Sequence, residues 1–312
     1  MSALLDVILP VFLVMGAGYF MTWRGVLSGE AIDGLMNFAQ GVGVPCVLFL
    51  GVANLDLSQD MALAPFMAFY TGAMVCFVVG GIAARVVFGR PGPDAVAIGF
   101  VCLFSNTLLL GLPITERAYG TAALTTNYAL IALHSPLMYA FGITAMEVVK
   151  THGQGLALHS VLAKIGRGLA RNPLLIAIAA GFVVNLLHIP LPGFALDAIK
   201  LVGSAGLPAS LFGLGGVLVR YRPDGDLRIV AMITGLSLIL HPLITWGLGT
   251  QTLGLTVPEL RSATVTSAMP PGINAYMFAH MYGVGKRVAA TSILVATALS
   301  VLSVWFWLQV LP

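Results

Sequence analysis

Residues 105–113, which read SNTLLLGLP, place polar side chains and helix breakers inside a long apolar stretch. The side chains that could bind a solute are Ser105, Asn106 and Thr107. Gly111 and Pro113 follow where an uninterrupted helix would run, and a proline removes a backbone donor and collides with the carbonyl four residues earlier. Freed backbone groups at membrane depth are tolerated only against protein or a water-filled cavity. The stretch predicts two half-helices around a binding site, and an ordinary proline kink is the alternative.

A second interruption occurs at residues 267–274, which read SAMPPGIN, and its apolar segment also ends in Tyr-Gly. The candidate site residues here are Met269, Pro270, Pro271, Gly272 and Asn274. Paired interrupted segments at matching positions of two halves point to the binding site of a transporter. We therefore expect both interruptions to contribute to one site.

The two halves of the chain align when the sequence is shifted by 163 residues. The matched pairs are Pro10 with Pro173, Gly18 with Gly181, Gly43 with Gly206, Pro45 with Pro208, 48–49 with 211–212, and 119–120 with 282–283. One offset that holds across several segments without gaps indicates an internal repeat.

The composition requires a membrane to surround these segments. The chain of 312 residues is 58% hydrophobic and only 9% charged, too few charges to cover a soluble domain of this size. Apolar stretches of about twenty residues, the length that crosses a bilayer as a helix, recur along nearly the whole chain. The N-terminus lacks a basic region and a cleavage-like site, so we expect the first span to be retained.

We predict an all-α polytopic membrane protein with ten transmembrane helices. The predicted spans are 3–22, 31–54, 62–88, 95–120, 122–148, 171–189, 195–219, 228–253, 258–282 and 286–310. Residues 1–149 form a first five-helix repeat, residues 150–170 a cytoplasmic connector, and residues 171–312 a second repeat. Because each repeat has an odd number of spans, the second is inverted relative to the first.

The basic residues set the predicted orientation. With both termini on one face, twelve of the fifteen Lys and Arg residues fall on the other face, and only Arg117, Lys200 and Arg261 remain with the termini. Cytoplasmic loops carry the excess of basic residues, so both termini should be periplasmic. A bacterial inner membrane is the expected location.

Catalytic and cofactor motifs are absent from the sequence. No Gly-rich loop leads into Lys-Ser/Thr, no histidines are paired at metal spacing, and no Gly-x-Ser-x-Gly occurs. Cys46, Cys76 and Cys102 lie inside apolar segments and suggest no disulfide framework. We expect no enzyme, no cofactor, no metal site and no nucleic-acid partner.

The 106–113 and 269–283 motifs resemble those of the auxin efflux carrier family, which includes plant PIN-type and bacterial malonate-type carriers within the bile acid sodium symporter superfamily. Pro45 and Pro208, in the second and seventh spans, also fit its pattern. The resemblance covers essentially the whole chain. It implies two inverted five-helix repeats, with the fourth and ninth helices broken and crossing at a central substrate site. Leu108, Leu109 and Leu110 depart from the small residues common there in the family, which leaves the path of the unwound backbone open.

The interrupted helices would suit an anion, because unpaired backbone N–H groups at a half-helix N-terminus attract negative charge. Asn106 and Asn274 offer donors as well, although Asn106 is alternatively only a cap. His134, mid-membrane in the fifth span, is either a substrate or proton site or a buried structural histidine. His241 and His280 are expected to be structural.

The sequence thus predicts a secondary transporter for a small organic anion, malonate-like, working by alternating access. The drive is expected to be protons or membrane potential, because 269–272 contains no carboxylate for sodium. The alternatives are a carrier for a larger amphipathic acid, auxin-like or bile-acid-like and possibly sodium-coupled, and a channel. The expected partners are the substrate, the lipid bilayer and possibly a second copy of the chain in a homodimer.

Overall fold

The structure is a computed structural model that describes residues 3–54, 63–151, 166, 170, 172–221 and 224–312. Most of the predicted connector 150–170 lies outside the described residues. The described elements are η1 (Ala3–Ile8), α1 (Leu9–Trp23), α2 (Gly29–Phe38), η2 (Ala39–Gly43), α3 (Val44–Ala53), α4 (Leu63–Val86), α5 (Gly92–Leu103), η3 (Thr107–Gly111), α6 (Leu112–Tyr119), η4 (Thr121–Leu124), α7 (Thr125–Lys150), α9 (Pro173–Leu186), α10 (Gly193–Leu218), α11 (Leu227–Gly235), η5 (Leu236–Leu240), α12 (His241–Gln251), α13 (Val257–Ser267), α14 (Ile273–Tyr282) and α15 (Lys286–Val310). No strand occurs in this part of the chain, so the predicted all-helical class is confirmed.

Within the described residues, seven helical stretches are long and apolar enough to cross a membrane. They are Leu5–Trp23, Gly29–Ala53, Leu63–Val86, Thr125–Lys150, Gly193–Leu218, Leu227–Gln251 and Lys286–Val310. The other predicted spans, 95–120, 171–189 and 258–282, contain shorter helices. Two of these three are interrupted where the sequence places its polar motifs.

Four helices begin with a proline at their second position, directly after a π-helical segment. The prolines are Pro10, Pro45, Pro113 and Pro242. A proline cannot donate to the preceding turn and collides with a carbonyl there. A wider π turn moves that carbonyl away, so the long helices continue past their prolines. Pro208 instead lies inside the regular helix α10.

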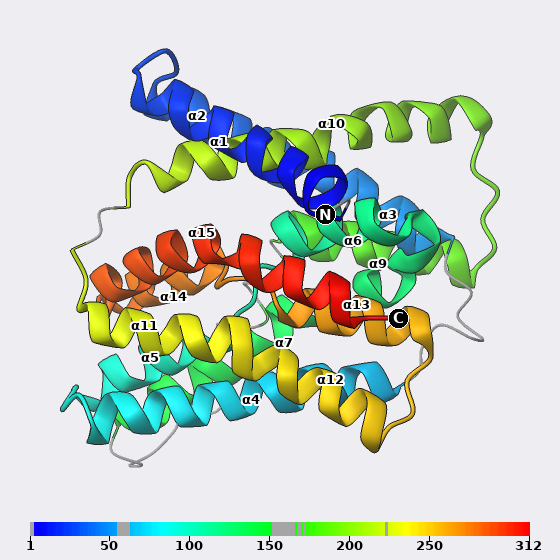
Figure 1. Cartoon of the computed structure of the whole chain (residues 1–312). Helices are drawn as coiled ribbons and strands as arrows, with labels where there is room; N and C mark the ends of the chain where they lie inside the picture. Colours follow the sequence, from blue (N-terminus) through cyan, green and yellow to red (C-terminus); the bar gives the residue numbers. More distant parts are fainter. Residues whose placement is uncertain (1–2, 55–62, 152–165, 167–169, 171, 222–223) are drawn as a thin grey trace.

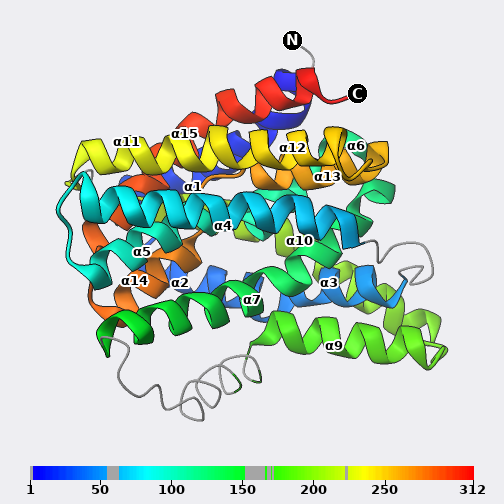
Figure 2. The ribbon, with the colours of Figure 1, turned by 90° about the horizontal axis from the view of Figure 1, so that it is seen from below.

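The helices form two packed groups, which Figure 1 shows on opposite sides of the molecule. In one group α1 packs along α10, and α3 packs against α9 and α10. In the other, α4 packs against α5, α12 and α13, and α15 packs against α11 and α14. We call the first group the scaffold and the second, together with η3, α6 and α7, the core group. Figure 2 shows α7 beside α3 and α9 at the border between the groups.

Glycines bring the scaffold helices into backbone contact. A Cβ on Gly43 would lie 2.6 Å from Gly206 Cα, so η2 and α10 meet at their glycines. Gly18 packs on the Phe212 carbonyl, and Gly181 packs on the Phe49 carbonyl. Small residues of this kind allow close helix contacts in membranes.

Candidate functional site

The two interrupted helices are joined to each other by their backbones. Between α5 and η3 the chain is non-helical at Phe104–Asn106, and α13 and α14 are separated by residues 268–272. The Asn106 N–H donates to the Pro270 carbonyl (2.8 Å), and the Gly272 N–H donates to the Phe104 carbonyl (2.9 Å). Ser105 and Pro271 form an isolated antiparallel bridge between these bonds. We call residues 104–106 and 270–272 the crossing.

The backbone after the crossing forms a π turn, Thr107–Gly111, that leads directly into α6. Asn106 caps this turn, because its Oδ1 accepts a hydrogen bond from the Leu109 N–H (3.2 Å). The unwound point therefore precedes Pro113, whose second position in α6 leaves the helix intact. Only the amide oxygen of Asn106 is used for capping, which leaves its NH₂ group available to a ligand.

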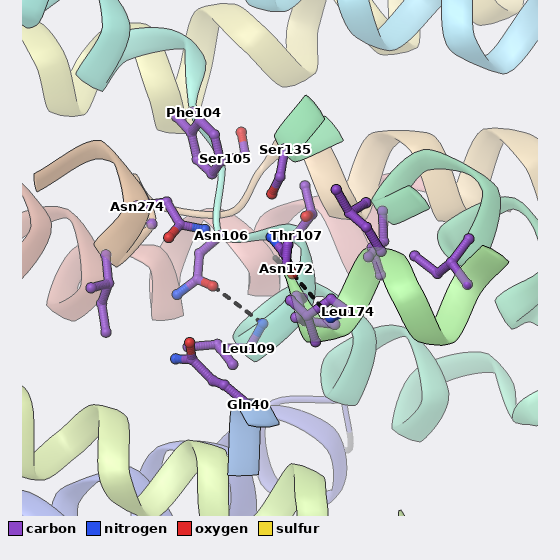
Figure 3. A pocket seen from close by; sticks show the side chains of 16 residues that line it. Gln40, Phe104, Ser105, Asn106, Thr107, Leu109, Ser135, Asn172, Leu174 and Asn274 are labelled. Carbon is purple, nitrogen blue, oxygen red and sulfur yellow. Dashed lines mark hydrogen bonds between the residues drawn. The ribbon is translucent and has the colours of Figure 1, made fainter. Parts of the chain in front are cut away.

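A small cavity of about 50 Å³ lies beside the crossing. Its described lining consists of four side-chain amides, three hydroxyl residues, apolar residues and Gly272. The polar residues that line it are Gln40, Asn106, Asn172, Asn274, Ser105, Thr107 and Ser135. Figure 3 shows these side chains around the space next to Asn106. We call this space the amide cavity. None of its described lining residues is charged.

The amide cavity lies between the two helix groups. Gln40 of η2 and Asn172, Leu174 and Ile178, at the start of α9, belong to the scaffold side. Residues 104–109 and 272–274 line it from the core group. Gly272 is the N-cap of α14 and no side chain caps this end, so the first N–H groups of α14 lie at the cavity without a side-chain partner.

The structure brings only some of the predicted site residues together. Ser105, Asn106, Thr107, Gly272 and Asn274 line the amide cavity, and Pro270 and Pro271 belong to the adjoining crossing. Met269 is fully buried, and its Cγ is 3.4 Å from the position a Gly111 Cβ would take, so these two residues pack together. Pro45 is buried in α3.

Pro113 and Pro208 line a different, larger cavity of about 890 Å³, which we call the Pro113 cavity. It lies between α1, α3 and α10 of the scaffold and α6 and α7. Its ionisable lining residues are Glu116, Arg117, Tyr128 and Lys200.

His134 is only 1% exposed and is not among the lining residues of the amide cavity. Its ring contacts Phe104, Phe69 and Tyr70, with centroid distances of 4.5, 5.6 and 6.2 Å. The adjacent Ser135 lines the cavity instead. The structure thus surrounds the predicted histidine with aromatic rings.

Gln40, Asn172 and His241 were not predicted as site residues. Gln40 precedes two glycines in an apolar span, and Asn172 precedes Pro173 at a helix start; these neighbours were the signals that the sequence offered. His241 is fully buried and lies between Ser105 Oγ (3.2 Å from Nδ1) and the Phe69 carbonyl (3.0 Å from Nε2). Its adjacent proline suggested only a kink.

A buried amide links three helices behind the crossing. The Asn127 Nδ2 group of α7 donates to Thr266 Oγ1 of α13 (2.7 Å) and approaches Thr115 Oγ1 of α6 (3.4 Å). All three side chains are fully buried. The network ties the second half of one interrupted helix to the first half of the other.

Comparisons with known proteins find relatives of this chain among membrane transporters. The model of a family described as "Membrane transport protein" matches residues 3–308. The "Uncharacterized transporter YfdV" of Escherichia coli (strain K12) is 19% identical over 97% of this chain and 96% of its own length. The "Uncharacterized transporter MJ1031" of Methanocaldococcus jannaschii is 22% identical over 97% of this chain and 98% of its own. "Auxin efflux carrier component 5" of Arabidopsis thaliana is 26% identical over 36% of this chain and 32% of its own.

Proposed function

We propose that this chain, a member of the membrane transport protein family, carries a small organic anion through the amide cavity. Its family makes the chain a transporter and not an enzyme. The carrier is a secondary transporter, and its substrate is a malonate-like carboxylate. The observation that supports this proposal is the uncharged, amide-lined cavity at the crossing of two interrupted helices.

A carboxylate in the amide cavity is held by dipoles. A cationic side chain buried beside the carboxylate would be costly in the membrane whenever the site holds no anion. The NH₂ groups of Asn106 and Asn274 and the first N–H groups of α14 supply donors instead, and the positive end of the α14 dipole favours negative charge. Each such bond to a charged group contributes about 1.5–3 kcal/mol.

The size of the amide cavity favours a small substrate over an auxin-like or bile-acid-like one. About 10–15 Å³ accommodates one water molecule, so the volume of about 50 Å³ corresponds to only a few water molecules. A large ligand would need the cavity to widen. Arg117 and Lys200 outnumber Glu116 in the Pro113 cavity, where they attract anions toward the protein.

The place of the amide cavity between scaffold and core group supports alternating access as the mechanism. Movement of one group against the other opens the cavity to one side of the membrane at a time. The backbone bonds of the crossing and the Asn127 network keep the interrupted helices together during this movement.

Contacts between equivalent positions support ten spans in two inverted repeats. Gly43 packs on Gly206, its own counterpart at the offset of 163 residues. Under the same shift, the contact of Gly18 with Phe212 becomes the contact of Gly181 with Phe49. Such reciprocal pairs are what a two-fold axis between repeats produces.

Ion pairs and hydrogen bonds support the predicted orientation. Arg117 donates to the carbonyls of Asp6 and Val7, and Arg261 donates to the carbonyl of Pro312, so two of the three minority basic residues contact the ends of the chain. The pairs Arg90–Asp226, Arg287–Asp224 and Arg220–Asp33 connect loops and helix ends on the face assigned to the cytoplasm. We place the termini in the periplasm.

Cysteine labelling tests this orientation. In a variant without Cys46, Cys76 and Cys102, Thr252→Cys in the α12–α13 loop should react with an impermeant thiol reagent from the periplasmic side. Glu30→Cys at the start of α2 should react only after the membrane is permeabilised. Both positions are exposed, so reversed labelling would contradict the termini-out orientation.

Counterflow in proteoliposomes tests the function. Protein-loaded vesicles containing unlabelled malonate should accumulate labelled malonate, and an indole acid of larger size should compete poorly. Imposed proton or potassium-diffusion gradients should alter uptake, and sodium should not be required. A strict sodium requirement, or accumulation of the larger acid in preference to malonate, would favour the alternative carrier.

A further inference from the structure

His241 has its hydrogen-bonding state fixed by its two partners. Its Nε2 lies 3.0 Å from the carbonyl oxygen of Phe69, which can only accept, so Nε2 carries a hydrogen. In the neutral ring Nδ1 is then an acceptor, and the hydroxyl 3.2 Å away on Ser105 must donate to it. The ring is fully buried and packs closely on Gly72 of α4, where a Cβ would lie only 2.7 Å from its Cδ2.

Ser105 connects this histidine to the amide cavity. It is part of the crossing and lines the cavity next to Asn106. In Figure 3 its side chain points away from Asn106 and Gln40, consistent with donation to a group behind the crossing. With its hydrogen directed to His241, the serine offers the cavity no donor.

We propose that Nδ1 of His241 is a proton-binding site that is coupled to the amide cavity through the hydroxyl of Ser105. This inference rests on the proposed function, in which a small organic anion occupies that cavity. One proton enters with each anion and leaves when the anion leaves.

Protonation reverses the hydrogen bond between the two side chains. When Nδ1 takes a proton from solution, both ring nitrogens are donors, and Nδ1–H donates to Ser105 Oγ. The serine hydrogen is then released from His241 and turns toward an oxygen of the anion. The proton thus adds one donor to the cavity and one positive charge behind the crossing, and no covalent bond to the anion forms.

His241 has no oppositely charged partner among the described residues. The titratable side chains that contact its neighbour Phe69 are His134 of α7 and Tyr70 of α4, and Cys76 of α4 donates to the Leu236 carbonyl in η5, which leads into α12. No hydrogen bond or ion pair of the described residues brings a carboxylate to either histidine. An imidazolium here is costly without a partner, so proton and anion stabilise each other. Phe69 contacts both histidine rings, and two adjacent positive rings would repel, which favours a single proton.

Calorimetry counts this proton. Malonate is titrated into the purified full-length protein at pH 7 in two buffers with different ionisation enthalpies. The wild type should take up about one proton per malonate. His241→Gln keeps a donor for the Phe69 carbonyl but cannot be protonated. This variant should take up no proton. It should bind malonate about tenfold or more weakly, because one hydrogen bond to a charged group is lost.

The control is His280→Gln, an exposed histidine that contacts Tyr276, which should keep the wild-type proton count. Ser105→Ala provides a second variant, in which malonate binding should lose most of its dependence on pH between 6.5 and 8.5. Proton uptake that persists in His241→Gln, or that disappears in His134→Gln alone, would overturn the assignment. If the wild type binds malonate without taking up a proton, the proton site is wrong and the proposed function stands. If the wild type does not bind malonate, the proposed function is contradicted as well.

Discussion

Asn106→Ala is expected to weaken binding of a small carboxylate about ten- to a hundredfold. The substitution removes an NH₂ donor at the amide cavity, and a hydrogen bond to a charged group contributes about 1.5–3 kcal/mol. Asn274→Ala should have a comparable effect from the α14 side. The measurement is the malonate concentration that half-saturates thermal stabilisation of the purified protein.

Asn106→Asp separates ligand binding from capping. It keeps an oxygen that can accept from the Leu109 N–H, removes the NH₂ group and adds a negative charge beside the anion. Binding should fall at least as far as in Asn106→Ala, while the unfolding temperature without ligand should fall less. Gln251→Ala, an exposed amide at the end of α12, is the control. Wild-type affinity in both Asn106 variants would exclude this residue from the site.

Gly206→Ala is expected to destabilise the packing of η2 against α10 in the scaffold. The added Cβ would lie 2.5 Å from Gly43 C and 2.7 Å from Val44 N, which are backbone atoms that cannot rotate away. Overpacking of this kind costs about 1–3 kcal/mol. The apparent unfolding midpoint of the purified protein should fall by several degrees.

Gly41→Ala is the matched control, because a Cβ there meets nothing within 4 Å and the residue lies in the same η2 segment as Gly43. Alanine in a helix is otherwise favoured over glycine by about 0.5–1 kcal/mol, so this variant should be unchanged or slightly stabilised. Equal effects of the two substitutions would mean that η2 and α10 are not in close contact.

The interruption of the helices was predictable, but its location was not. Pro113 indicates a disturbed turn, and the sequence therefore suggested that the helix unwinds near it. The π turn of η3 accommodates Pro113, and the non-helical residues lie earlier, at Phe104–Asn106, where backbone bonds to Pro270 and Gly272 replace the helical ones. Such bonds are made between segments far apart in sequence, so local preferences could not reveal them.

The polar residues of the two interrupted motifs line one cavity, and the sequence did not point to the residues that line it with them. Asn106 and Asn274 stand out because they accompany glycine and proline in apolar segments. Gln40 and Asn172 also lie beside glycine or proline, but outside the two interrupted segments, and only the packing of the scaffold against the core group brings them to the cavity. For His241 the adjacent proline explained its position in sequence, and only the structure shows its contact with Ser105.

The crossing is held together by main-chain atoms alone, and this has a consequence for how specificity can change among relatives. The bonds accept at the carbonyls of Pro270 and Phe104, which any residue supplies, and donate from the N–H groups of Asn106 and Gly272, which any residue except proline supplies. Side chains at 105, 106 and 274 can therefore be exchanged without removing the joint that positions them. Relatives that are only 19% and 22% identical to this chain over nearly its whole length can in this way keep the same backbone joint while the side chains around it differ.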